Sequence, residues 1–242
     1  MERAENFPSL TISTLRIRAT GAAVRIAVDE TADIQVAVSG EHPDSVKLLR
    51  QEGTLSITQS LHPMRKVSEI TVTLPMDWKG AVDIRTLTGA ISASGVTGTD
   101  LALRSLTGGI YAEALTGITA HLRTVTGSIG VSDLACDHCR MRTLAGQMIL
   151  SACGFMACKA SALFSRAEMD LVSPFDSLSV CCLFGGMTVY APLAHADATL
   201  SSIRGRMLTE DVSIVSGAPR VAMKSITANL QLICSLETQA MM

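Results

Sequence analysis

Four pentapeptides dominate the middle of this chain: Arg85-Thr86-Leu87-Thr88-Gly89, Arg104-Ser105-Leu106-Thr107-Gly108, Arg123-Thr124-Val125-Thr126-Gly127 and Arg142-Thr143-Leu144-Ala145-Gly146. Each begins 19 residues after the one before it. A weaker form continues at residues 162–165, 182–185, 202–205 and 225–228, where the spacing lengthens to 20 and finally 23 residues. A fixed period of this kind indicates a repeat architecture, in which each unit buries its apolar face against its neighbours.

Apolar residues alternate on both sides of this motif. In the first repeat, Ile84 precedes the glycine corner, and Ile91 and Ala93 follow it with a spacing of two, which is one face of a strand. Glycine suits a sharp corner because it tolerates positive φ and close approach of neighbouring backbone. A unit punctuated by Thr-Gly and rich in Thr, Val and Ile has the composition of strands and not of helices. The same apolar columns recur in all eight repeats: Ile84, Leu103, Leu122, Met141, Ala160, Val180, Leu200 and Met223 before the corner, and Ile91, Ile110, Ile129, Met148, Ala167, Met187, Met207 and Leu230 after it.

We therefore predict an all-β fold: a single-stranded β-solenoid (β-helix) of about eight rungs over residues 77–242, with a β-rich N-terminal capping region over residues 1–76. Rungs about 4.8 Å apart would make a rod roughly 38 Å long. In the cap, residues 15–18, 24–28, 34–38, 55–58 and 70–74 alternate like half-buried strands, and residues 41–51 predict a helical turn or a loop. Residues 230–242 carry no evident polar cap, which leaves an end-to-end partner, a strand that folds back or a frayed tail.

Composition excludes some functions and partners. Hydrophobic residues make up 48% and aromatic residues 3%, which suits stacked aliphatic ladders. With 20 Lys+Arg against 22 Asp+Glu, the overall charge suggests neither a nucleic-acid partner nor an anionic membrane. Residues 1–8 lack the basic and apolar regions of a secretory signal, so we expect a cytoplasmic location, with the cell envelope (through a partner or a trimmed signal) as the alternative. The apolar segment 143–164 contains Gln147 and Lys159 and keeps the repeat register, so we expect no membrane span.

A known family shares these features. Alternating strands that end in Thr73-Leu74-Pro75, followed by rungs of the form Thr-x-Thr/Ser-Gly-x-Ile, resemble the bacterial "putative adhesin" β-strand-repeat family, a domain of unknown function. The resemblance implies a non-enzymatic β-helix that acts as a binding or interaction module, with no cofactor and no functional residues to carry over. The alternative is a bactofilin-like cytoplasmic scaffold that self-associates through its open ends, although the long N-terminal strand region fits that family poorly.

The repeat places Arg85, Arg104, Arg123 and Arg142 at one outward position. If the register holds, four guanidinium groups line up along one face. Because Arg pairs bidentately with carboxylate and phosphate, the functional hypothesis is a stripe that binds a polyanionic glycan or a teichoic-type phosphate polymer, or an acidic protein partner. The alternative is an exposed polar column that repeat duplication has copied.

A second column is apolar in all eight repeats, from Leu87 to Ile226. Strict alternation would point these side chains outward, which would make an interface for lateral dimerisation. We expect instead that a bulge at the corner turns them inward, because a column that is apolar in every repeat is typical of a core. The column comprises Leu87, Leu106, Val125, Leu144, Leu163, Leu183, Ile203 and Ile226.

Neither a metal centre nor an active site is predicted. The spacing of Cys136, His138, Cys139, Cys153 and Cys158 superficially suggests zinc, but on this solenoid only Cys139 and Cys158 should stack, and buried Cys behaves as a small hydrophobe. A polysaccharide-acting enzyme would need clustered carboxylates, and the acids of the repeat region do not share a column. They are Asp83, Asp100, Glu113, Asp133, Glu168, Asp170 and Asp176. The stacked pair of His121 and Arg140 is interpreted as surface decoration.

Overall fold

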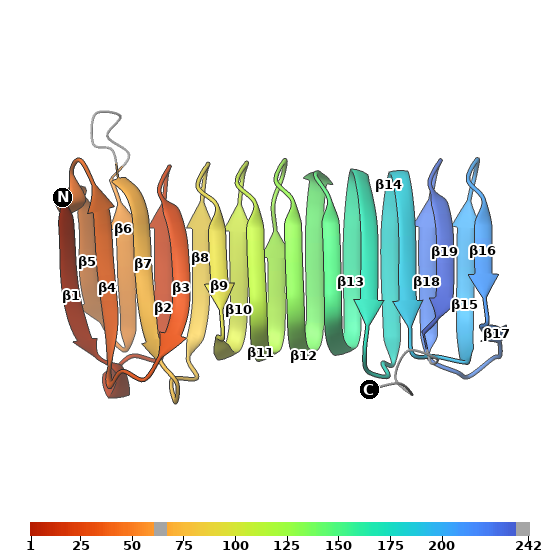
Figure 1. The fold of residues 1–242 in the computed structure, drawn as a ribbon, viewed down its shortest axis with the longest axis horizontal. Helices are drawn as coiled ribbons and strands as arrows, with labels where there is room; N and C mark the ends of the chain where they lie inside the picture. Colours follow the sequence, from red (N-terminus) through yellow and green to blue (C-terminus); the bar gives the residue numbers. More distant parts are fainter. Residues whose placement is uncertain (61–66, 236–242) are drawn as a thin grey trace.

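The computed structural model describes residues 1–60 and 67–235, and this part of the chain is all-β apart from two short 3-10 helices, Ser9–Thr11 and Pro43–Ser45. The strands lie side by side in an elongated stack (Figure 1). They are β1 (Glu2–Pro8), β2 (Thr14–Ala19), β3 (Ala23–Asp29), β4 (Asp33–Gly40), β5 (Val46–Gln51), β6 (Thr54–Gln59), β7 (Val67–Pro75), β8 (Ala81–Thr86), β9 (Ile91–Ser94), β10 (Thr97–Ser105), β11 (Ile110–Arg123), β12 (Ile129–Ala145), β13 (Met148–Leu171), β14 (Ser177–Ala191), β15 (His195–Ser202), β16 (Met207–Glu210), β17 (Ser213–Ile214), β18 (Arg220–Ser225) and β19 (Asn229–Cys234).

The middle of the stack is built from parallel pairs in which each repeat lies beside the next. Strand β11 pairs through its first residues with β9 and through its last residues with β10, and then along its length with β12. The register places Ile110 opposite Ile129 and Leu122 opposite Met141, so the apolar columns inferred from the sequence are confirmed in the middle of the stack. These side chains are fully buried and belong to one continuous hydrophobic core. In the outermost repeat Met207, which was predicted to be interior, lies opposite Leu230 but is exposed, because no further repeat covers it. The segment 143–164, which the sequence placed in the repeat, lies in β12 and β13.

A buried hydroxyl ladder explains the chemistry of the corner. In the third pentapeptide, Thr124 Oγ1 accepts a hydrogen bond from the Gly127 N–H and donates one to the Gly108 carbonyl of the preceding repeat, both at 3.1 Å. The hydroxyl thus satisfies two buried backbone groups where the chain turns and the strand ladder is interrupted. In the same way, the hydroxyls of Thr86, Ser105, Ser202 and Ser225 each accept a hydrogen bond from the backbone N–H three residues further along the chain.

The corner glycines are required chiefly by close packing. A Cβ on Gly127 would lie 2.2 Å from the carbonyl oxygen of Gly108. Positive φ, the other reason that the sequence suggested, applies among the corner glycines only at Gly146 and Gly185, with φ of 143° and 138°. Stacked corners therefore approach so closely that no side chain fits between them.

A second corner of each repeat escaped the sequence analysis. Gly95, Ala114, Asp133 and Ala152 follow one another at 19-residue intervals and all adopt left-handed backbone conformations, with φ between 51° and 70°. Alanine carries this conformation at a cost, since its Cβ crowds the backbone there. Three of the four residues are not glycine, so the sequence has no glycine column that would predict this second corner.

The N-terminal residues continue the parallel stacking before they change to antiparallel strands. Strands β2 and β3 pair in parallel with β8 and β9, and β6 and β7 lie outside them. Strands β1, β4 and β5 then pair antiparallel. The five expected strands are present, whereas residues 46–51, expected as part of a helical turn or loop, form β5 instead. The division at residue 76 stays a prediction.

At the other end, the last two repeats exchange places. Strands β18 and β19 lie directly against β14, and β15 and β16, although earlier in the chain, lie outside them (Figure 1). The connection through β17 explains the 23-residue step, because the chain must return across the outer repeat. Among the described residues the outermost repeat exposes Met207, Leu208, Ile214 and Val215. Of the C-terminal segment 230–242 whose end the sequence left open, residues 230–234 belong to β19, which lies between β14 and β16, and residues 236–242 lie outside the described residues.

Candidate functional site

The four arginines of the repeat lie in register on neighbouring strands. Arg104 is opposite Arg85 on one side and Arg123 on the other, and Arg123 is opposite Arg142. Arg18 of β2 pairs with Arg85 and lengthens the column to five, the arginine column from here on. The sequence analysis missed Arg18 because it lies 67 residues before Arg85, although Ile17-Arg18-Ala19 does imitate Ile84-Arg85-Thr86.

An aspartate neutralises one end of the arginine column. The Asp83 carboxylate lies 2.6 Å from the Arg18 guanidinium and 3.4 Å from that of Arg85. Burial alone would raise the pKa of Asp83, but the hydrogen bond and charge of Arg18, together with Arg85, outweigh it and hold that pKa below its ordinary value. Asp83 is therefore ionised at neutral pH, and Arg18 and Arg85 are engaged within the protein.

The other end of the column carries uncompensated positive charge. Within residues 1–60 and 67–235, no carboxylate forms an ion pair with Arg104, Arg123 or Arg142. The neighbouring outward column adds His121, Arg140 and Lys159, which face one another in consecutive strands. A shallow groove of about 310 Å³ runs between the two columns, lined by Arg104, His121, Leu122, Arg123, Arg140 and Arg142. The pair of His121 and Arg140 that the sequence interpreted as decoration thus belongs to a basic surface.

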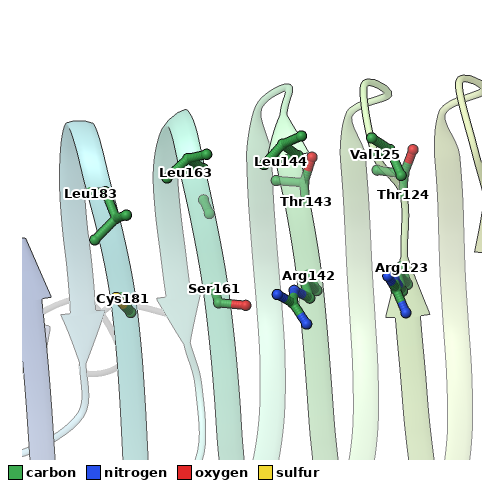
Figure 2. Close-up of a pocket in the computed structure, with 11 residues that line it drawn as sticks. Arg123, Thr124, Val125, Arg142, Thr143, Leu144, Ser161, Leu163, Cys181 and Leu183 are labelled. Atoms are coloured by element: carbon green, nitrogen blue, oxygen red, sulfur yellow. The ribbon is translucent and has the colours of Figure 1, made fainter.

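The column changes character after Arg142, where Ser161 and Cys181 take the same outward position (Figure 2). These small side chains leave a groove of about 350 Å³ beside Leu144, Leu163 and Leu183. Figure 2 shows the two arginines in line at one end of this groove and the aliphatic side chains along the corner. Basic and apolar side chains thus lie next to each other on one edge of the molecule.

The aliphatic corner column points outward, so the prediction of inward burial is wrong. Leu87 and Leu106 are each 46% exposed, Leu144 is 44% exposed and Ile203 is 76% exposed, and none of the eight members is buried. The interior position at the corner belongs to Thr124 and its equivalents, whose hydroxyl satisfies the glycine N–H and the carbonyl of the preceding repeat, and in two later repeats to the small side chains of Ala162 and Cys182. The leucine that follows is then directed to the surface. We call these eight residues the corner ridge.

Five of the seven cysteines are interior side chains, and Cys181 and Cys234 are partly exposed. Cys139 lies opposite Cys158 as the repeat predicts, and Cys136, Cys153 and Cys182 are buried as well. Burial raises the pKa of Cys153 to about 11, so its thiol stays protonated at neutral pH and is a poor metal ligand. In the described part of the chain, no group of three or more His, Cys, Asp or Glu is placed to hold a metal ion.

The carboxylates of the repeats face other residue types across the strands. Asp100 lies opposite Thr119 and bonds to its hydroxyl at 2.6 Å, and Glu113 lies opposite Ser132. Asp170 lies opposite Tyr190. The parallel register therefore brings no two of these acids together as an acid and base pair.

Comparison with known proteins assigns the family. The model of the Toastrack DUF4097 family matches residues 12–233. The chain belongs to this family. Toastrack DUF4097 is a domain of unknown function, so the family resemblance seen in the sequence is confirmed and no activity comes with it. No curated protein matches the chain.

Three solved structures resemble this Toastrack chain in fold and are distant from it in sequence. A "putative lipid binding protein" from Parabacteroides distasonis is 11% identical, with 96% of each chain covered and a TM-score of 0.54. A "putative adhesin" from Parabacteroides merdae, also 11% identical, covers 96% of this chain and 95% of its own at a TM-score of 0.47. A "putative adhesin" from Bacteroides fragilis is 11% identical, covers 97% of both chains and has a TM-score of 0.45. At such identity the likeness concerns the fold alone.

None of the described helices is long and apolar enough to span a membrane.

Proposed function

We propose that this protein is a non-enzymatic binding module, a β-solenoid of about eight rungs that presents a basic face to a polyanion. The observation that carries the proposal is the run of Arg104, Arg123 and Arg142 in register, without a carboxylate partner among the described residues. A catalytic role is not proposed, because the acids of the repeats lie opposite Thr, Ser and Tyr.

The geometry suits an extended anionic polymer. Neighbouring strands place successive guanidinium groups about 4.8 Å apart, and each planar fork can hold a carboxylate or phosphate through two hydrogen bonds. His121, Arg140 and Lys159 widen the positive surface to a second row. A chain of sulfated, carboxylated or phosphorylated units laid along the three repeats of Arg104, Arg123 and Arg142 would thus meet a cation at each of them, and salt would weaken its binding.

The test is binding of two soluble probes, long-chain polyphosphate and polygalacturonate, measured by calorimetry at several salt concentrations. The Arg104→Gln/Arg123→Gln/Arg142→Gln variant should lose binding of both probes. The matched control, Arg25→Gln/Lys47→Gln/Arg50→Gln, removes the same charge from exposed positions of β3 and β5 and should bind like the wild type. Equal affinity of the two variants would refute a polyanion site at the arginine column.

A gain of affinity provides an independent check. Replacing Asp83 by Asn frees Arg18 and Arg85 and adds two cations to the column. We expect the Asp83→Asn variant to bind polyphosphate more tightly and with a steeper salt dependence. Unchanged affinity would mean that the column does not contact the polymer.

The second candidate is a bactofilin-like scaffold that self-associates through its ends. The observation that favours it is the outermost repeat of β15 to β17, which exposes Met207, Leu208, Ile214 and Val215. Molar mass by light scattering over a hundredfold concentration range decides between them. Mass that grows with concentration would favour the scaffold, and a constant mass would favour the binding module. An envelope location would suit the first function and a cytoplasmic one the second.

A further inference from the structure

We propose that the edge formed by the corner ridge and the arginine column docks on the surface of an anionic lipid bilayer. The inference rests on the proposed binding function, since it shares the arginines, and it names the partner. Its own support comes from the ridge, from the absence of acid in the corner segments, and from the short distance between the two columns.

The ridge is a continuous apolar line along the eight repeats from Leu87 onward. The exchange of the last two repeats does not interrupt it, because Ile226 lies between Leu183 and Ile203: the Ile226 N–H bonds to the Leu183 carbonyl at 3.1 Å, and the Arg204 N–H to the Ile226 carbonyl at 2.9 Å. Phe164 and Phe184 add two stacked rings to the same corner, with centroids 5.0 Å apart and both side chains exposed. An aligned apolar surface of this length marks an interface and not the ordinary scatter of exposed side chains.

Apart from Asp83 at one end of the arginine column, the described acids lie away from the corners that carry the ridge. The corner segments 85–91, 104–110, 123–129, 142–148, 161–167, 181–187, 201–207 and 224–230 contain no Asp or Glu. Arg104, Arg123 and Arg142 flank the ridge without a carboxylate partner in the described residues. A second copy of the chain docked ridge to ridge would bury the leucines but would bring no carboxylate to these arginines. An anionic bilayer meets both requirements, because its acyl chains cover the leucines and its phosphates pair with the arginines.

The spacing of the two columns matches a membrane interface. Arg123 is the last residue of β11 and Val125 lies two residues further on in the corner, so the chain holds the two at most about 7 Å apart. Groups that bind at an interface bury their apolar face about 5–10 Å into the boundary between headgroups and acyl chains. With the corner ridge at that depth, the guanidinium groups lie at the level of the phosphates, where each basic residue adds affinity for anionic lipid.

The experiment is sedimentation of the full chain with vesicles of phosphatidylcholine alone or of phosphatidylcholine mixed with phosphatidylglycerol. We expect the wild type to sediment with the mixed vesicles and not with phosphatidylcholine alone. The ridge variant, Leu106→Asn/Leu144→Asn/Leu163→Asn, should lose on the order of tenfold or more in affinity. The Arg104→Gln/Arg123→Gln/Arg142→Gln variant should lose on the order of a hundredfold.

A matched control removes equal apolar surface away from the corner. Ile118, Ile149 and Met156 are similarly exposed, so the Ile118→Asn/Ile149→Asn/Met156→Asn variant should bind vesicles like the wild type. Circular dichroism of each variant checks that the fold is kept.

The outcomes separate this inference from the polyanion site. The ridge variant should keep its affinity for soluble polyphosphate, because that probe needs only the arginines. If the ridge variant binds mixed vesicles as the wild type does, or if the wild type binds polyphosphate but no vesicle, bilayer docking is wrong and the polyanion site stands. If the wild type binds neither probe, both proposals fail. A wild-type dimer that the ridge substitutions dissociate, with no vesicle binding, would assign the ridge to a second copy instead.

Discussion

The buried hydroxyl at the corner is the feature whose energetic contribution follows most directly from the structure. Thr124→Val keeps the shape of the side chain and removes the hydroxyl, which leaves the Gly127 N–H and the Gly108 carbonyl without their partner inside the protein. All three residues are buried, so water cannot replace the lost hydrogen bonds. A buried polar group left unsatisfied costs about 1–3 kcal/mol, and two of them give a loss of about 2–5 kcal/mol in the free energy of unfolding.

Urea denaturation followed by circular dichroism measures this loss. With a slope of about 3 kcal/mol per M, the midpoint should fall by about 1 M. Thr124→Ser should recover most of the loss, since Ser105 occupies the equivalent position in the preceding repeat and makes the same bond at 2.8 Å. Thr126→Val, two residues further on at an exposed position, should shift stability by no more than about 0.5 kcal/mol. A Thr124→Val protein as stable as the wild type, or a Thr126→Val protein equally weakened, would refute the role of the hydroxyl ladder.

Three further predictions follow from the packing and the ionisable groups. Gly127→Ala should lower the urea midpoint by more than Thr124→Val or prevent folding, because its Cβ would lie 2.2 Å from a carbonyl oxygen, whereas Gly186→Ala, with no atom within 4 Å, should be tolerated. Because the pKa of Asp83 is lowered by Arg18, its stabilisation is complete above about pH 4 and is lost as the pH falls further, so wild-type stability measured from pH 5 to pH 3 should fall more steeply than that of Asp83→Asn. At pH 8 a thiol reagent should leave Cys153 and the four other buried cysteines unmodified in the native protein and modify all seven in urea; rapid native modification of the five would contradict the burial.

Much of the repeat could be predicted because its causes are local. The alternation around Ile84 and Ile91 identifies the interior face of each strand, and a constant spacing of 19 residues sets the parallel register that aligns Arg104 with Arg123. The corner ridge was predicted to be buried because only composition was considered at that position. The buried N–H of Gly127 needs an acceptor, and the Thr124 hydroxyl provides it, which places Thr124 inside and Val125 outside. This requirement can be seen only from the hydrogen bonds of the structure.

The sequence alone determined the all-β class, the interior columns and the alignment of the four repeat arginines, since each depends on residues within one period. The tertiary structure decided that β18 and β19 lie against β14, that Arg18 joins the column and that Asp83 neutralises one end of it. These features join segments far apart in the chain. Every repeat has the same unpaired backbone N–H and C=O groups along its free edge. The sequence of one repeat therefore does not determine which other repeat pairs with it. That choice rests on the connections and on the packing of the whole stack.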